Sequence, residues 1–189
     1  KVDLENGECT NVSLVTTGEV LGHNMFLNEA GIDSFVKCVE NTQVKAYYKH
    51  SDENEALSSI GYFEDFKKVK TDEGEYKVVG NFTALNAWKT NNEKEYSTFF
   101  ELAEKAPEVF GISLEGLINT GYYNSDEELV MVENEMPEEG TKLYAFCEKI
   151  LALSVVSTPA TNPNGLFSLE VEEDIEQLEE GLRDIFGKA

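Results

Sequence analysis

The fold is decided by a strand–turn–strand stretch at residues 60–82, which reads IGYFEDFKKVKTDEGEYKVVGNF. Aromatic and β-branched residues run along residues 60–69, and residues 71–74 have the composition of a turn. Beyond the turn, one set of residues recurs at every second position: Tyr76, Val78, Gly80 and Phe82. A period of two residues is typical of a strand with one buried face, so the stretch predicts a β-hairpin.

The segments before this hairpin predict one helix between two strands. Residues 12–21 have strand character that Gly18 interrupts, and Asn28 can cap a helix. The apolar positions of that helix have the spacing of one buried face: Ile32, Phe35, Val36 and Val39. Residues 44–50 then alternate as a strand does, and His50 ends this strand on the face of its apolar set: Val44, Ala46 and Tyr48.

The segments after the hairpin predict a second helix, three strands and a last helix. Asn92 and Glu95 resemble a capping box, and the helix that follows is expected to end at Pro107. Strands are expected at residues 111–119, 142–148 and 149–156. The last apolar residues step by four and three, which predicts an amphipathic helix: Val171, Ile175, Leu178, Leu182 and Ile185. The chain is therefore expected to be an α+β domain of mainly antiparallel strands with an acidic C-terminal helix.

The composition excludes several classes of protein. The 189 residues suffice for one ordinary domain, and 37 acidic against 15 basic residues give a net charge of −22. A surface this acidic repels phosphate backbones and anionic lipid, so nucleic acid and membranes are not expected as partners. There is no apolar run of bilayer length and no signal-peptide core at the start of the chain.

The three cysteines predict neither a disulfide framework nor a zinc site, because they are far apart and include no CxxC pair. Cys147 has apolar neighbours, and the chain has no histidine after His50 that could activate it. Cys147 is therefore expected to be a buried structural thiol. A reducing cytosolic compartment is the expected one.

Histidine is scarce, and this makes the two histidines informative. His50 lies where a strand meets a loop, which suits a general base, and His23 lies in a Gly-His-Asn sequence just before the first helix. Ser113 is the candidate nucleophile, because it lies on a predicted strand between apolar residues and close to Gly111 and Gly116. Taken singly, a strand serine or a rim histidine is more often structural than catalytic.

The order of several motifs resembles a known family. These are YYKH at residues 47–50, SIGYFEDF at 59–66, FFELA at 99–103, APEVFGIS at 106–113, SVVSTPA at 154–160 and NGLF at 164–167. Together, over residues 12–167, they resemble the prohead (capsid maturation) serine proteases of tailed bacteriophages, a group similar to herpesvirus assemblin. The resemblance implies an assemblin-like, antiparallel β-barrel-like core with packed helices. It also implies a catalytic domain at residues 1–168 and a helix at 169–189 that could begin a linker or scaffold segment.

The resemblance also assigns roles to residues. The family's nucleophile corresponds to Ser113 and its general base to His50. The third catalytic group corresponds to His23, in a Ser-His-His arrangement, whereas phage relatives commonly have a carboxylate early in the chain. Glu19 and Asp33 are therefore alternatives for the group that orients His50. With no arginine before Arg183, backbone N–H groups or a held water are expected to stabilise the oxyanion.

The function implied is that of a serine endopeptidase of phage head maturation. Its substrates would be scaffold and major capsid proteins, and the enzyme itself, cut inside the assembling prohead in the cytoplasm of the bacterial host. No metal or organic cofactor is implied, and a homo-oligomer is compatible with the family. The alternative is a non-catalytic acidic scaffold or capsid-assembly domain that retains the protease fold.

Overall fold

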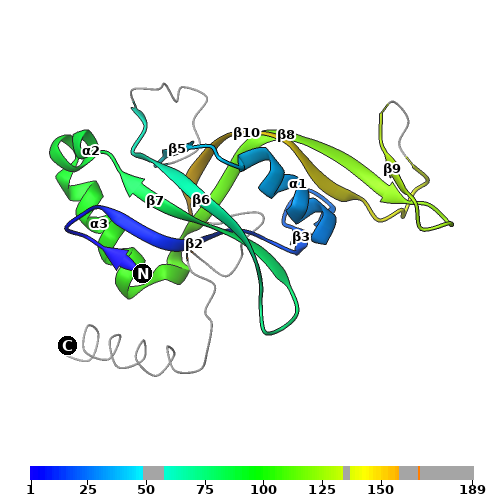
Figure 1. Cartoon of the computed structure of the whole chain (residues 1–189), viewed down its shortest axis with the longest axis horizontal. Coiled ribbons are helices and arrows are strands. Elements are labelled where there is room, and N and C mark those ends of the chain that lie inside the picture. The colour runs from blue at the N-terminus through cyan, green and yellow to red at the C-terminus, as the bar shows by residue number, and fades with distance from the viewer. Residues whose placement is uncertain (49–57, 134–136, 158–165, 167–189) are drawn as a thin grey trace.

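The computed structural model describes residues 1–48, 58–133, 137–157 and 166, and it has the α+β architecture that the sequence predicts. The strands of the described part form one ten-stranded sheet (Figure 1). Its main path runs β1 (Val2–Asp3), β2 (Glu8–Thr16), β7 (Tyr76–Ala84), β6 (Gly61–Lys70), β5 (Val44–Tyr47), β10 (Tyr144–Val156), β4 (Met25–Leu27) and β3 (Gly18–Val20). β8 (Gly111–Tyr123) pairs with β10 outside this path, and β9 (Leu129–Met131) pairs with β8.

The hairpin at residues 60–82 is confirmed as β6 and β7. The two strands are antiparallel, and Lys70 lies opposite Tyr76 at the turn. The Gly74 N–H donates to the Thr71 carbonyl at 3.0 Å, and Gly74 has φ +85°, a conformation that glycine adopts at little cost. The alternation predicted the strand correctly, although residues 77–80 of β7 are buried on both faces.

The first helix is also confirmed, as α1 (Glu29–Val39). Asn28 caps it, since its side-chain oxygen accepts a hydrogen bond from the Gly31 N–H at 2.9 Å. The buried face of α1 carries Ile32, Phe35 and Val39. The helix packs against β10, and so it covers one side of the central strands.

The second predicted helix is α3 (Glu93–Lys105), but the capping box predicted for it is wrong. The Asn92 side chain makes no capping hydrogen bond, and the Asn92 N–H donates instead to the Trp88 carbonyl. Asn92 therefore ends a short helix, α2 (Asn86–Asn91), that the sequence pattern did not reveal. A 3₁₀ turn at Pro107–Val109 follows α3 and leads into β8.

The two strands predicted at residues 142–148 and 149–156 are a single strand, β10. Its pairing with β8 shifts register between Cys147 and Lys149 and again between Ile150 and Ala152. Each shift inserts one residue and reverses the alternation of side chains, which resembles a strand end in the sequence. β8 is likewise longer than predicted. The C-terminal half of β8 and the N-terminal half of β10 extend away from the rest of the molecule as an arm (Figure 1).

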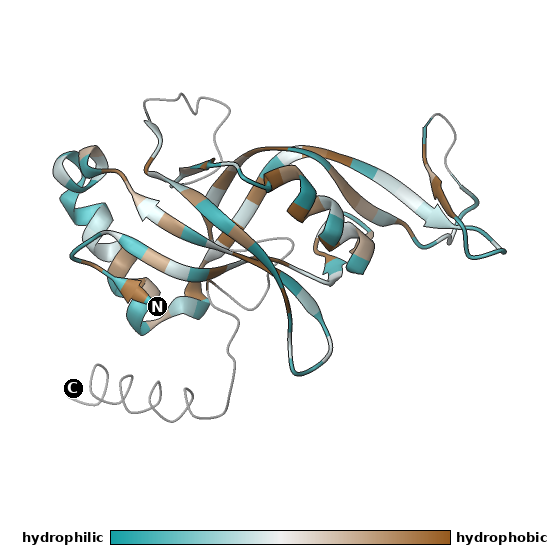
Figure 2. Ribbon diagram, in the orientation of Figure 1, coloured by the Kyte–Doolittle hydropathy of each residue, from teal (hydrophilic) through white to brown (hydrophobic). Residues whose placement is uncertain are grey.

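The core is a cluster of aromatic side chains between the β6–β7 hairpin and α3. Phe82 is at its centre, with ring centroids 5.2 Å from Phe63 and 5.3 Å from Phe99. Apolar residues lie along the strands and helices that enclose this cluster (Figure 2). One detail of β5 differs from expectation: Tyr47 is buried, whereas Tyr48 follows the strand and is 37% exposed.

The strand pairings form an open sheet and do not show the closure of a barrel. The helix expected at residues 169–189 and the domain boundary at residue 168 lie outside the described residues.

Candidate functional site

Ser113 is the third residue of β8, and the residues on either side of it are packed into the core. Ile112 before it is fully buried, and Leu114 after it packs against the core. Successive side chains of a strand point to opposite faces, so Ser113 is directed to the face opposite that of Ile112 and Leu114. Ser113 is half-buried.

Ser113 on β8 is two strands away from β5, the strand that precedes His50 in the sequence. β10 lies between β8 and β5. Ser154 of β10 lies opposite Ser113 in β8 and, on its other side, in register with Tyr47 of β5. His50 itself lies outside the described residues, three positions beyond Tyr47. The described part of the molecule thus brings the end of β5 to within two strand spacings, about 10 Å, of Ser113.

A buried hydrogen bond lies beside Ser113. Ser154 has no exposed surface, and its hydroxyl donates to Oε1 of Glu115 at 2.5 Å. Glu115 is half-buried and is two residues beyond Ser113 in the same strand. Sequence reasoning missed Glu115, because one glutamate among 37 acidic residues is not conspicuous in the sequence.

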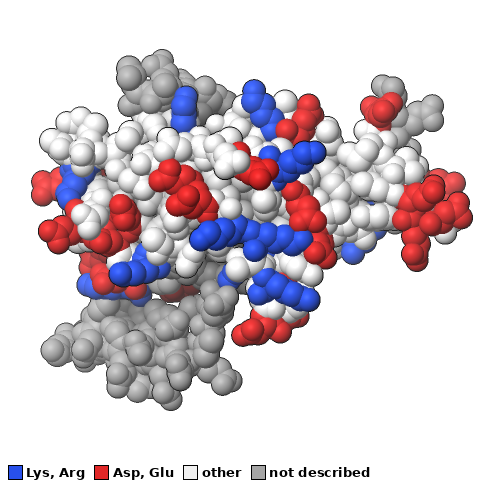
Figure 3. Space-filling model, viewed as in Figure 1, with Lys and Arg blue, Asp and Glu red and all other residues white. Residues whose placement is uncertain are grey.

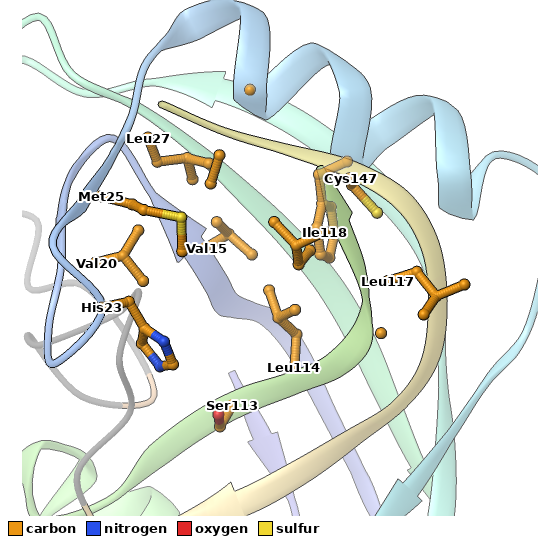
Figure 4. Close-up of a pocket in the computed structure, with 14 residues that line it drawn as sticks. Val15, Val20, His23, Met25, Leu27, Ser113, Leu114, Leu117, Ile118 and Cys147 are labelled. Carbon is orange, nitrogen blue, oxygen red and sulfur yellow. The ribbon is translucent and has the colours of Figure 1, made fainter. Parts of the chain in front are cut away.

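An apolar pocket of about 510 Å³ borders Ser113 (Figure 4). His23 lines it too, and most of the remaining lining is aliphatic or aromatic: Val15, Val20, Met25, Leu27, Phe35 and Leu114. The volume is in the range of pockets that bind small molecules or single side chains. Chemically, the pocket can desolvate an apolar group that lies beside Ser113.

The structure therefore brings His23 and Ser113 to one pocket, but it does not join them. His23 is exposed in the turn between β3 and β4, and its backbone N–H donates to the Val20 carbonyl at 3.1 Å. Between these two described side chains there is no hydrogen bond.

The two alternative carboxylates, Glu19 and Asp33, are not part of the pocket lining. Asp33, on α1, accepts from Nζ of Lys68 at 2.6 Å, and Glu29 shares the same ammonium. Glu19 is exposed on β3. Neither Glu19 nor Asp33 lines the pocket.

Cys147 also lines the pocket, and its environment favours the neutral thiol. Burial and the neighbouring Cys38 thiol raise its pKa above the ordinary range, and burial raises the pKa of Cys9 to about 12. The thiolate is the nucleophilic form of cysteine, so these groups are poorly suited to nucleophilic catalysis at neutral pH. All three cysteines are free thiols.

The described residues contain no group of three His, Cys, Asp or Glu side chains that could hold a metal ion. Within the same ranges, none of the helices has the length and apolar run that a membrane span needs. Acidic side chains are spread over the face in Figure 3 and gather at the end of the arm, where residues 126–128 are acidic.

Comparisons of the chain with family models, with curated proteins and with solved structures found no match in any of the three. The resemblance to the prohead proteases rests on the motifs quoted above.

Proposed function

We propose that the protein is a serine endopeptidase of phage head maturation, with Ser113 as nucleophile and His50 as general base. One observation carries the proposal: Ser113 borders an apolar pocket and is aligned, through β10, with the strand that leads to His50. His50 follows the end of β5 by three residues in the sequence. The substrates proposed are scaffold and capsid-protein segments, and the chain itself.

The reaction follows from the chemistry of a serine–histidine pair. As Ser113 Oγ attacks the scissile carbonyl carbon, its proton passes to the His50 imidazole. The imidazolium then protonates the leaving amine as the C–N bond breaks, and an acyl-enzyme remains. Water attacks the acyl group, gives its proton to His50, and the Ser113 hydroxyl is restored when the carboxylic acid leaves. Backbone N–H groups would stabilise the oxyanion.

The pocket beside Ser113 supports a preference for an apolar substrate side chain. Apart from His23, Ser113 and Cys147, its lining offers only hydrocarbon, methionine sulfur and backbone. A charged substrate side chain would lose its hydration there without gaining a partner. The dense negative charge of the whole chain also opposes binding of strongly acidic segments (Figure 3).

A fluorophosphonate tests the proposal without knowledge of the natural substrate. In the labelling reaction, Ser113 Oγ bonds to phosphorus, the P–F bond breaks with loss of fluoride, and the hydroxyl proton passes to the base. We expect one label per chain, at Ser113, and none on the heat-denatured protein. Peptide mass mapping locates the label. Labelling at another serine, or at none, would contradict the proposal.

Filling the pocket is expected to change specificity more than nucleophilicity. Val20→Phe adds a ring to the pocket lining, so cleavage of substrates with a large apolar residue at the cut should fall about tenfold or more in kcat/KM. Labelling by a small fluorophosphonate should change less than threefold. Leu21→Phe is the matched control, because Leu21 is exposed and does not line the pocket. Equal effects of the two variants would argue against this pocket as the substrate site.

A non-catalytic assembly domain is the second candidate function, and the arm favours it. Large apolar side chains are exposed along the far parts of β8, β9 and β10: Leu117, Ile118, Tyr123, Leu129, Met131 and Leu151. Exposed apolar residues on a protruding ribbon are typical of surfaces that bind other proteins. An assembly role needs no nucleophile, so substitution of Ser113 distinguishes the two candidates.

A further inference from the structure

We propose that the pocket beside Ser113 binds a small amphiphile, an aliphatic chain of about 10 to 16 carbons with an uncharged head group. Binding of this kind needs neither a nucleophile nor a general base, so it goes beyond the proposed function and is independent of it. It uses the whole pocket, of which one substrate side chain would fill only a part.

The volume of the pocket is larger than one side chain needs. It measures about 510 Å³, whereas an apolar cavity of about 150 Å³ is enough to bind one benzene ring. A phenylalanine side chain is only one methylene larger than that ring, so it would leave most of the pocket unfilled. Apolar walls that face empty space lose their dispersion contacts, and a longer hydrocarbon ligand would restore them.

Apolar side chains from two parts of the chain face each other across the pocket (Figure 4). Val20 of β3 and Met25 of β4 lie on one side, and Leu114 and Ile118 of β8 lie on the other. The lining residues that the structure describes include no lysine, arginine, aspartate or glutamate. A charged ligand would therefore lose its hydration there without gaining an ionic partner. The net charge of −22 opposes an anionic head group as well.

α1 forms one wall of the pocket and is fixed to β10. Gly31 approaches β10 so closely that a Cβ at this position would lie 2.6 Å from the Ala145 carbonyl oxygen. Along the same helix, Ser34 Oγ accepts from the Cys147 N–H at 2.8 Å, and the Cys38 thiol donates to the Cys147 carbonyl at 3.4 Å. Gly31, Ala145 and Cys147 all line the pocket. This wall is therefore formed before a ligand arrives, and little ordering of the protein opposes binding.

The polar side chains of the pocket indicate where the head group lies. His23 and Ser113 lie toward one end of the pocket in the view of Figure 4, and Leu27 lies toward the other end. Imidazole and hydroxyl groups both donate and accept hydrogen bonds, which suits a hydroxyl or amide head group. A peptide segment fits less well, because its backbone N–H and C=O groups would lie along the apolar walls without partners.

The test is displacement of an uncharged fluorescent probe, N-phenyl-1-naphthylamine, from the full chain by primary alcohols from 1-hexanol to 1-dodecanol. We expect the affinity of the alcohols to rise about fourfold with each added methylene, because each one buries further apolar surface. Decanoate, which has the same number of carbons as 1-decanol but a charged head, should bind about tenfold more weakly.

A pair of methionine variants locates the binding site. Met25→Trp places an indole in the pocket, so binding of the probe and of 1-decanol should weaken about tenfold or more. Met131→Trp is the matched control, because Met131 is exposed on β9 and does not line the pocket; it should change binding less than threefold. If Met25→Trp fails to fold, Val20→Phe takes its place, with Leu21→Phe as its control.

Each remaining result would overturn the proposal in a distinct way. An affinity that does not depend on chain length, or equal losses in a pocket variant and its control, would reject the pocket as the binding site. Decanoate binding as tightly as 1-decanol would reject the uncharged head group. An uncharged peptide of alternating leucine and alanine that displaces the probe at lower concentration than 1-decanol would replace the amphiphile with a peptide partner.

Fluorophosphonate labelling separates this proposal from the proposed function. A chain that is labelled at Ser113 but does not bind the probe or the alcohols would remove the amphiphile site alone. A chain that binds them but is not labelled would remove the serine endopeptidase alone.

Discussion

On the proposed function, Ser113→Ala is expected to leave scaffold and capsid proteins uncut when the chain is expressed together with such proteins. The substitution removes the only atom that would form the acyl-enzyme, so the rate of cleavage should fall at least about 10³-fold. The fold should be unaffected, because Ser113 is half-buried and alanine fits a strand position of this kind. Gel electrophoresis and mass spectrometry of the assembled particles would measure the cleavage.

The matched control for this experiment is Ser97→Ala, since Ser97 is an exposed serine on α3, away from the pocket. It should process its substrates as the wild type does. An unchanged cleavage pattern with Ser113→Ala would reject the enzyme and favour the assembly domain. In that case, substitution of the exposed apolar residues of the arm should impair particle formation.

Phe82→Ala is expected to have the largest effect on stability. Its ring is 1% exposed and packs against rings of β6 and α3, so truncation removes buried surface and leaves a cavity that the sheet cannot close. A loss of about 3–5 kcal/mol in the free energy of unfolding is expected. For a domain of this size, the melting temperature should fall on the order of 10 °C or more.

Calorimetry or thermal circular dichroism would measure this loss, with Phe26→Ala as the matched control. Phe26 is half-buried on β4, and its ring contact among the described residues is with Tyr144, at a centroid distance of 6.5 Å. Truncation of Phe26 should lower the free energy of unfolding by clearly less than truncation of Phe82. Equal costs at the two positions would mean that the Phe82 cluster is not the centre of the core.

Local patterns predicted most of the elements, and the exceptions have physical causes. The β6–β7 hairpin and α1 were predictable because one buried face imposes a period of two or of 3.6 residues. β10 was divided in two because its bulges at Glu148 and Leu151 interrupt that period. Asn92 was taken for the cap of α3, since the sequence does not show whether an asparagine side chain or its backbone makes the bond.

The candidate site was predictable only in part. Ser113 was found from its strand and its motif, and His23 does border the same pocket. Glu115 was not found, because a glutamate in a chain with 37 acidic residues carries no signal of its own. Its hydrogen-bond donor, Ser154, is 39 residues away in the sequence and opposite Ser113 in the sheet.

The amino-acid sequence by itself determined the element types, the α+β class, the strong negative charge and the choice of Ser113 and the two histidines as candidates. These follow from short-range periodicity and composition, which need no knowledge of distant partners. The tertiary structure alone decided the neighbours: which strand flanks Ser113, which carboxylate a buried hydroxyl fixes, and which apolar side chains enclose the pocket. Such neighbours depend on strand order and register, and these are set by packing between segments that are far apart in the chain.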